Sequence, residues 1–150
     1  SPWMSALYFQ AARRLYDKHG DTLVLEQASN YFDWLDVNGF YDGSLSHPSM
    51  AGIVIPRYLT GELIGDAGYD EGNADHALDV AGFVRFARRA KLVLNLPTNR
   101  VDARLAELAN TTEWSFDNWT RTTTYLPKYR LSPPRKFNWW VRGALELIEN

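Results

Sequence analysis

Hydrophobic residues recur at helical spacing along most of the chain. Near its start, an apolar stripe at this spacing consists of Met4, Tyr8, Ala11 and Leu15. The stripe predicts a helix over Ser5–His19, which Gly20 is suited to end because glycine adopts the left-handed conformation at little cost. A second helix is predicted over Thr22–Asp36. Its apolar stripe consists of Val24, Ala28, Tyr31, Phe32 and Leu35.

The second half of the chain begins with a helix of much wider apolar arc, predicted over Ala74–Leu94. The apolar positions of this helix are Ala77, Val80, Ala81, Phe83, Val84, Phe86 and Ala87. Such an arc predicts a central, mostly buried helix. Further helices are predicted from Thr98 or Asn99 to Ala109, from Glu113 to about Thr124, and after Ser132-Pro133-Pro134, a sequence typical of a helix start. The total is five to six helices.

Residues 40–73 interrupt this helical pattern. They contain six of the ten glycines, together with Pro48 and Pro56. Ser46-His47-Pro48 is suited to start a short helix. Ile53-Val54-Ile55 is suited to a brief strand, so a small β-hairpin is one interpretation of this segment. The pattern as a whole predicts a mainly α single compact domain over residues 1–150, with an irregular Gly-rich insertion at 40–73.

Composition narrows the classes of function. The chain has 150 residues, the length of about one domain, and no cysteine. The absence of cysteine excludes a disulfide scaffold, a Cys-ligated zinc site and a thiol nucleophile. No apolar run approaches the roughly 18 residues of a membrane span, and the N-terminal residues do not resemble a signal peptide. We therefore expect a cytoplasmic protein without a membrane partner. We interpret Ser1–Trp3 as a possible cloning scar.

The charges are divided unevenly along the chain, although the net charge is only −2. Residues 1–75 hold four Lys or Arg and eleven Asp or Glu, whereas residues 76–150 hold twelve and seven. The two halves therefore carry net charges of −7 and +5. This asymmetry has two interpretations. Either the halves fold against each other and neutralise, or each half presents a charged surface to a partner, including a second copy of the chain.

An acidic and aromatic cluster around residues 31–42 is our leading candidate site. Its expected protein-binding residues are Asp33, Trp34, Asp36, Tyr41 and Asp42. Exposed Trp and Tyr ringed by charge are typical of protein interfaces. The cluster predicts a non-catalytic helical protein that acts through protein–protein contacts. Its acids suit a basic site on a partner that handles nucleic acid.

A basic and aromatic segment, residues 118–142, gives the alternative function. Its candidate residues for binding single-stranded DNA or RNA are Arg121, Tyr125, Lys128, Tyr129, Arg130, Arg135, Lys136 and Trp139. In such sites cations follow the phosphates and rings stack on bases. The isoelectric point near 5.9 argues against a dedicated nucleic-acid binder. A weaker version places a helix-turn-helix at residues 98–124, with residues 110–112 as its turn.

Catalytic and metal-binding motifs are sparse. The chain has no HExxH, GxSxG, P-loop or GxGxxG sequence. A small hydrolase or lyase using His47 or His76 is a third hypothesis, because Asp79 follows His76 at helical spacing. The acidic loop 66–75 departs from the calcium-loop pattern at its glycine and its twelfth position. We therefore expect no metal and no cofactor.

Overall fold

The fold is mainly helical, as the sequence predicts. In the computed structural model of the chain, the described residues are 1–60, 69 and 71–120, and the side chains of residues 71, 72, 116 and 118–120 are left aside. This part contains four α-helices rather than five to six. They are α1 (Pro2–His19), α2 (Leu23–Asn38), α3 (Ala77–Val93) and α4 (Asn99–Thr120). The predicted C-terminal helix lies outside the described residues.

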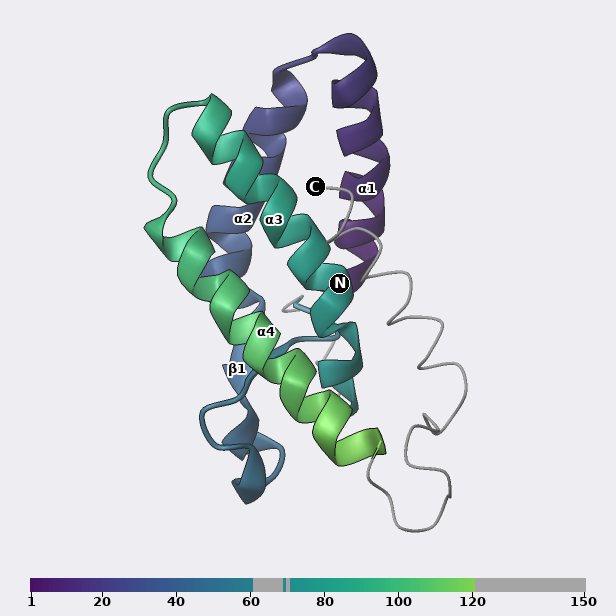
Figure 1. Cartoon of the computed structure of the whole chain (residues 1–150), viewed down its shortest axis with the longest axis vertical. Coiled ribbons are helices and arrows are strands. Elements are labelled where there is room, and N and C mark those ends of the chain that lie inside the picture. Colours follow the sequence, from purple (N-terminus) through teal and green to yellow (C-terminus); the bar gives the residue numbers. More distant parts are fainter. Residues whose placement is uncertain (61–68, 70, 121–150) are drawn as a thin grey trace.

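The four helices form two layers, with α3 and α4 in front of α1 and α2 in the view of Figure 1. The helix α3 is central because it packs against α1, α2 and α4. Its Phe83 ring contacts Phe9 of α1 and Tyr31 of α2, with ring centroids 4.6 and 5.2 Å apart. The wide apolar arc of the sequence is therefore explained by neighbours on several sides of α3.

Two glycines shape the α1–α2 pair and its exit. Gly20 ends α1 in the left-handed conformation, with φ at 71°, and its N–H donates to the carbonyl of Tyr16. Gly39 follows α2 at a point of close approach. A Cβ atom there would lie 2.8 Å from the carbonyl oxygen of Leu35 and nearer still to the Leu35 side chain. Only glycine fits this passage from helix to strand.

The Gly-rich insertion contains the small β-hairpin considered from sequence. Strand β1 (Phe40–Asp42) pairs antiparallel with β2 (Val54–Pro56), and Tyr41 lies opposite Ile55. Between them lie two 3₁₀ turns, η1 (Gly43–Leu45) and η2 (Pro48–Met50), and a third, η3 (Glu71–His76), precedes α3. Tyr41, Met50, Ile55 and Ala74 form a second, smaller core beneath α4.

The predicted break between residues 109 and 113 is wrong, because α4 runs unbroken from Asn99 to Thr120. Thr111 is fully buried, and its hydroxyl lies 2.6 Å from the carbonyl oxygen of Val54 in β2 and 3.0 Å from that of Glu107. Thr112 bonds in the same way to the carbonyl of Leu108. Hydroxyls that bond the carbonyl four residues earlier are compatible with a continuing helix. A helix-turn-helix at residues 98–124 is excluded for the same reason.

Candidate interaction surface

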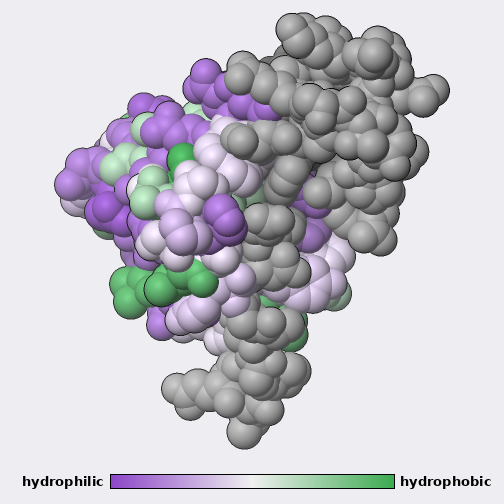
Figure 2. All heavy atoms as spheres, turned by 90° about the horizontal axis from the view of Figure 1, so that it is seen from below, coloured by the Kyte–Doolittle hydropathy of each residue, from purple (hydrophilic) through white to green (hydrophobic). Residues whose placement is uncertain are grey.

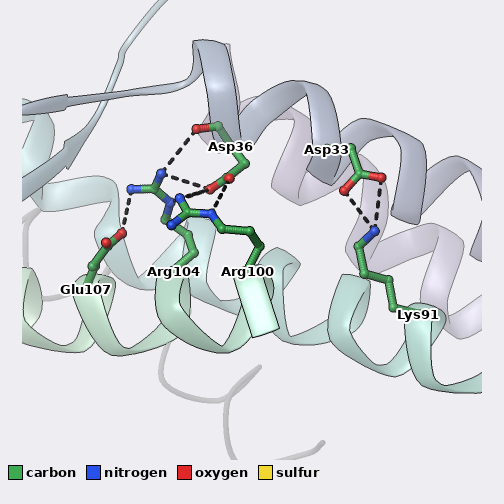
Figure 3. A network of polar contacts seen from close by, with 6 residues as sticks. All are labelled: Asp33, Asp36, Lys91, Arg100, Arg104 and Glu107. Carbon is green, nitrogen blue, oxygen red and sulfur yellow. Dashed lines mark hydrogen bonds and ion pairs between the residues drawn. The ribbon is translucent and has the colours of Figure 1, made fainter. Parts of the chain in front are cut away.

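Acidic residues of α2 form ion pairs and hydrogen bonds with basic residues of α3 and α4 (Figure 3). Arg100 donates two hydrogen bonds to the Asp36 carboxylate, from Nε to Oδ2 at 2.7 Å and from Nη2 to Oδ1 at 2.8 Å. Arg104 adds a bond from Nε to Oδ1 at 2.9 Å and one from Nη2 to the Asp36 carbonyl at 3.1 Å. Asp33 accepts from Lys91 Nζ at 3.0 Å. Both acids are thus engaged within the molecule.

The electrostatics at Asp36 follow from this geometry. Burial alone would raise the pKa of its carboxyl, but the hydrogen bonds and charges of Arg100 and Arg104 outweigh burial and lower that pKa. Arg104 is buried to 8% side-chain exposure, pairs also with Glu107 at 2.7 Å, and lies over the Phe40 ring. Because α2 has no basic residue in its last turn, Arg104 supplies the cation that the carbonyl end of a helix favours.

Three basic residues of α3 each reach a different helix. Arg88 pairs with Asp102 of α4, Arg89 with Asp17 of α1 at 2.8 Å, and Lys91 with Asp33 of α2. Four of the acid–base contacts described so far, made by the three acids Asp17, Asp33 and Asp36, join the acidic half of the chain to the basic half. Of the two interpretations of the charge split, this arrangement favours neutralisation between the halves.

The five predicted protein-binding residues are not gathered on one surface. Trp34 is exposed to 44% and stacks on Tyr31, with ring centroids 5.8 Å apart. Tyr41 is only 6% exposed and belongs to the core beneath α4, which is not the exposed position that the hypothesis requires. Asp42 is exposed, but its two carboxylate oxygens accept from the N–H groups of Ser44 and Gly52. Hydrogen bonding by the Ser44 side chain, followed by the N–H groups of Ser44 and Gly52, lowers the pKa of Asp42. Trp34 remains the accessible aromatic residue of the set.

A different group of residues surrounds Trp34 on the surface. Among the described residues, twelve large hydrophobic side chains are exposed, and six of them belong to α1 or α2. These six are Met4, Tyr8, Leu15, Leu23, Trp34 and Val37. They lie on the side of the two helices opposite the residues buried against α3. We call this surface the outer face.

The two helices share the outer face. The Tyr8 hydroxyl of α1 donates to Gln27 Oε1 of α2 at 3.2 Å, which joins the two stripes across the pair. The stripe of α1 can be recognised in the sequence, but the sequence does not show that this stripe is exposed. Both sides of α1 are apolar, and the smaller stripe with Ala6, Phe9 and Ala12 is the one that packs inward.

The hairpin end of the molecule has a different character. In the view from below, its described surface is mostly hydrophilic, and hydrophobic residues gather only in small separate groups (Figure 2). Leu45 of η1 is exposed to 55%, and Tyr58 just after β2 and Tyr69, whose ring contacts Tyr41, are exposed as well. Half of the exposed large hydrophobic residues thus lie on the outer face, and a smaller group, Leu92, Val93 and Leu96, lies at the end of α3 and just after it.

The two candidate catalytic histidines occupy different surroundings. His47 caps η2, and its Nδ1 lies 2.8 Å from Ser49 Oγ and accepts from the Ser49 N–H. This is a local capping arrangement on an exposed turn. His76 is buried, stacks on Trp3 at 5.0 Å between ring centroids, and has Nδ1 3.7 Å from Asp79 Oδ2. The Ser49 hydroxyl lies beside the His47 imidazole, but among the described residues no third side chain contacts this imidazole to orient it as a catalytic base.

Several sequence predictions stay untested. The nucleic-acid-binding candidates, from Arg121 to Trp139, lie outside the described residues. The interpretation of Ser1–Trp3 as a cloning scar also stays a hypothesis, although Trp3 lies within α1 and packs on His76. Over the described ranges, no group of three or more His, Cys, Asp or Glu residues is arranged to hold a metal ion. None of the helices in this part of the chain combines the length and hydropathy needed to cross a bilayer.

Comparison with known proteins adds no relative to these observations. No family model, curated protein or solved structure matches the chain.

Proposed function

We infer that this chain is a non-catalytic binding protein that acts through protein–protein contacts at the outer face of α1 and α2. The observation that carries the inference is the concentration of half of the exposed large hydrophobic residues on this one face. Soluble proteins rarely leave a contiguous apolar surface without a partner. Trp34 and Tyr8 are of the residue types that dominate binding energy at protein interfaces.

The proposal places the contact on apolar side chains and not on the acids around Trp34. Asp36 is held by two arginines and Asp33 by Lys91, so neither carboxylate offers an uncompensated charge to a basic partner. A surface that imitates nucleic acid needs several such charges. Of the residues that the sequence suggests for protein binding, Trp34 is therefore the one that the proposed contact uses.

Site-specific photocrosslinking in the native cell tests the proposal. A photoreactive phenylalanine analogue replaces Trp34 in one variant and Leu45 in a matched control, since both side chains are about half exposed. We expect protein adducts from position 34, identified by mass spectrometry, and few or none from position 45. Equal adducts from both positions, or none from position 34, would contradict a binding role for the outer face.

A further inference from the structure

The outer face carries a repeat that the monomer does not use. In α1 the exposed stripe is Met4, Tyr8, Ala11 and Leu15, with steps of four, three and four residues. In α2 the exposed stripe is Leu23, Gln27, Asn30, Trp34 and Val37, with steps of four, three, four and three. Alternation of three and four is the spacing of core positions in bundled and coiled helices. Each helix therefore has one stripe that packs on α3 and a second stripe with bundle spacing that faces outward.

The dimensions of the outer face suit a helix-pair partner. Helices of 18 and 16 residues that lie side by side form a surface about 25 Å long and about 20 Å wide. Small stable interfaces bury about 800 Å² of accessible surface on each partner. Two helices laid on this face cover an area of that order, whereas a single peptide helix covers only about half of its width.

Charge identifies the partner. Helix α1 carries three basic residues and one acid, whereas α2 carries three acids and neither Lys nor Arg. Around the outer face, Lys18 lies on the α1 side, and Glu26 with Asp21 lies on the α2 side, all of them exposed. Near the α1–α2 turn, the face thus has an exposed base on the α1 side, the basic edge, and exposed acids on the α2 side, the acidic edge. Such a face is complementary to itself when a two-fold axis lies parallel to the helices.

We propose that the outer face binds a second copy of this chain, so that two α1–α2 pairs form a four-helix bundle. With the axis parallel to the helices, α1 of each copy faces α2 of the other in antiparallel orientation, and the basic edge meets the acidic edge. Gln27 and Asn30 then lie within the seam. Polar residues at such positions fix register and orientation at some cost in stability. This proposal rests on the proposed function and names the partner for the same surface.

Mass measurement of charge-directed variants tests the arrangement. The full chain of 17.2 kDa is followed by analytical ultracentrifugation from about 1 to 100 µM. The wild-type chain is expected to reach twice its monomer mass.

Val37 is 78% exposed, so its substitution leaves the monomer fold intact. In the proposed bundle position 37 lies opposite the first turns of the partner copy's α1, which carry no Lys or Arg, so Val37→Lys and Val37→Glu should each raise the dissociation constant at least tenfold. Leu15 faces the acidic edge, so Leu15→Glu should raise the dissociation constant more than Leu15→Lys.

The control for these variants is Leu45→Lys, which changes an exposed leucine at the hairpin end and should leave the dimer unchanged. A wild-type chain that stays monomeric at 100 µM would overturn the proposal. The same holds if Leu45→Lys weakens a dimer as much as the substitutions at positions 15 and 37 of the outer face. A larger effect of Leu15→Lys than of Leu15→Glu would overturn the orientation and with it the proposed bundle. Adducts from position 34 to another protein, together with a monomeric mass, would leave the proposed function standing without this partner.

Labelling distinguishes a second copy from coverage by the chain itself. Because the chain has no cysteine, Val37→Cys and Leu45→Cys each introduce a single thiol. We expect the thiol at position 37 to react with a maleimide as fast as that at position 45 below the dissociation constant and several-fold more slowly above it. Protection at position 37 that is independent of concentration would assign the face to residues of the same chain and refute the dimer.

Discussion

Asp36 is the residue on which the two halves of the chain converge. Its carboxylate accepts from Arg100 and Arg104, and its carbonyl accepts from Arg104 as well. Because its pKa is lowered in the folded state, the carboxylate contributes stability above the unfolded pKa of about 3.9, and this contribution is lost as the pH falls through the folded pKa. A partly buried acid between two guanidinium groups acts mainly by keeping Arg104 paired.

Replacing Asp36 by Asn should lower the free energy of unfolding by about 2 kcal/mol at pH 7, because hydrogen bonds to charged groups are lost and a buried guanidinium keeps fewer partners. Urea unfolding at pH 7 and pH 3 measures the change. Asp17→Asn is the matched control, since its pair with Arg89 is exposed on both sides and should contribute less than about 1 kcal/mol. The difference between Asp36→Asn and wild type should shrink toward pH 3. Equal losses from both variants would show that the Asp36 cluster has no special role.

The contacts that Asp36 makes within the molecule could not be predicted from the sequence. The residue was predicted to face a partner because it lies among aromatic residues on a polar helix face. Its actual partners follow it by 64 and 68 residues, and no local pattern specifies a pair so distant. Tyr41 illustrates the same limit, because its burial depends on Met50, Ile55 and Ala74, which only the folded hairpin brings beneath α4.

At the scale of elements, local spacing predicted the helices well and their boundaries less well. The stripes of α1, α2 and α3 place all three within a few residues of their observed ends. Spacing did not show which stripe of α1 faces inward, since both are apolar. It also failed at residues 110–112. There, β-branched threonines weaken the local helical preference, and the tertiary contact of Thr111 with β2 favours continuation of α4.

Thr111→Val tests this contact between α4 and the hairpin. Valine keeps the shape of threonine but removes the hydroxyl, so the free energy of unfolding should fall by about 1–2 kcal/mol as the Val54 carbonyl loses a buried donor. Hydrogen exchange of the hairpin amides, including the Gly43 N–H bonded to Ile53, should quicken more than that of α1. Thr112→Val removes a bond only within α4 and should change stability by less than about 0.5 kcal/mol. A similar loss in both variants would contradict a linking role for Thr111.

At the scale of the whole molecule, α3 holds the described part together. It packs on three helices, pairs charges with each of them, and contributes Phe83 to the aromatic contacts with Phe9 and Tyr31. The wide apolar arc predicted this central place from sequence. The helix that each of these charges contacts could not be predicted from sequence. Arg88, Arg89 and Lys91 are near neighbours in sequence but point in different directions around α3.

Phe83→Ala should therefore weaken the whole described fold and not one element. A cavity at a fully packed aromatic position costs about 3–5 kcal/mol, a large part of the total stability of a small domain. Far-ultraviolet circular dichroism and tryptophan fluorescence should shift together to lower urea concentration. Val93→Ala, at a half-exposed position near the end of the same helix, should have little effect. Separate transitions for the two probes would show that the layers unfold independently.

The order of the elements has a consequence during synthesis. The ribosome makes α1 and α2 before α3. Helix α3, which covers their inner stripe and neutralises Asp17 and Asp33, is complete only 55 residues after the end of α2. At about 5–20 residues per second this interval lasts roughly 3–11 seconds. Throughout it, the nascent helix pair exposes apolar residues on both sides and lacks its basic partners. Polysomes that carry several such nascent chains therefore bring outer faces together before either chain has acquired its core, and assembly of two copies competes with the arrival of α3.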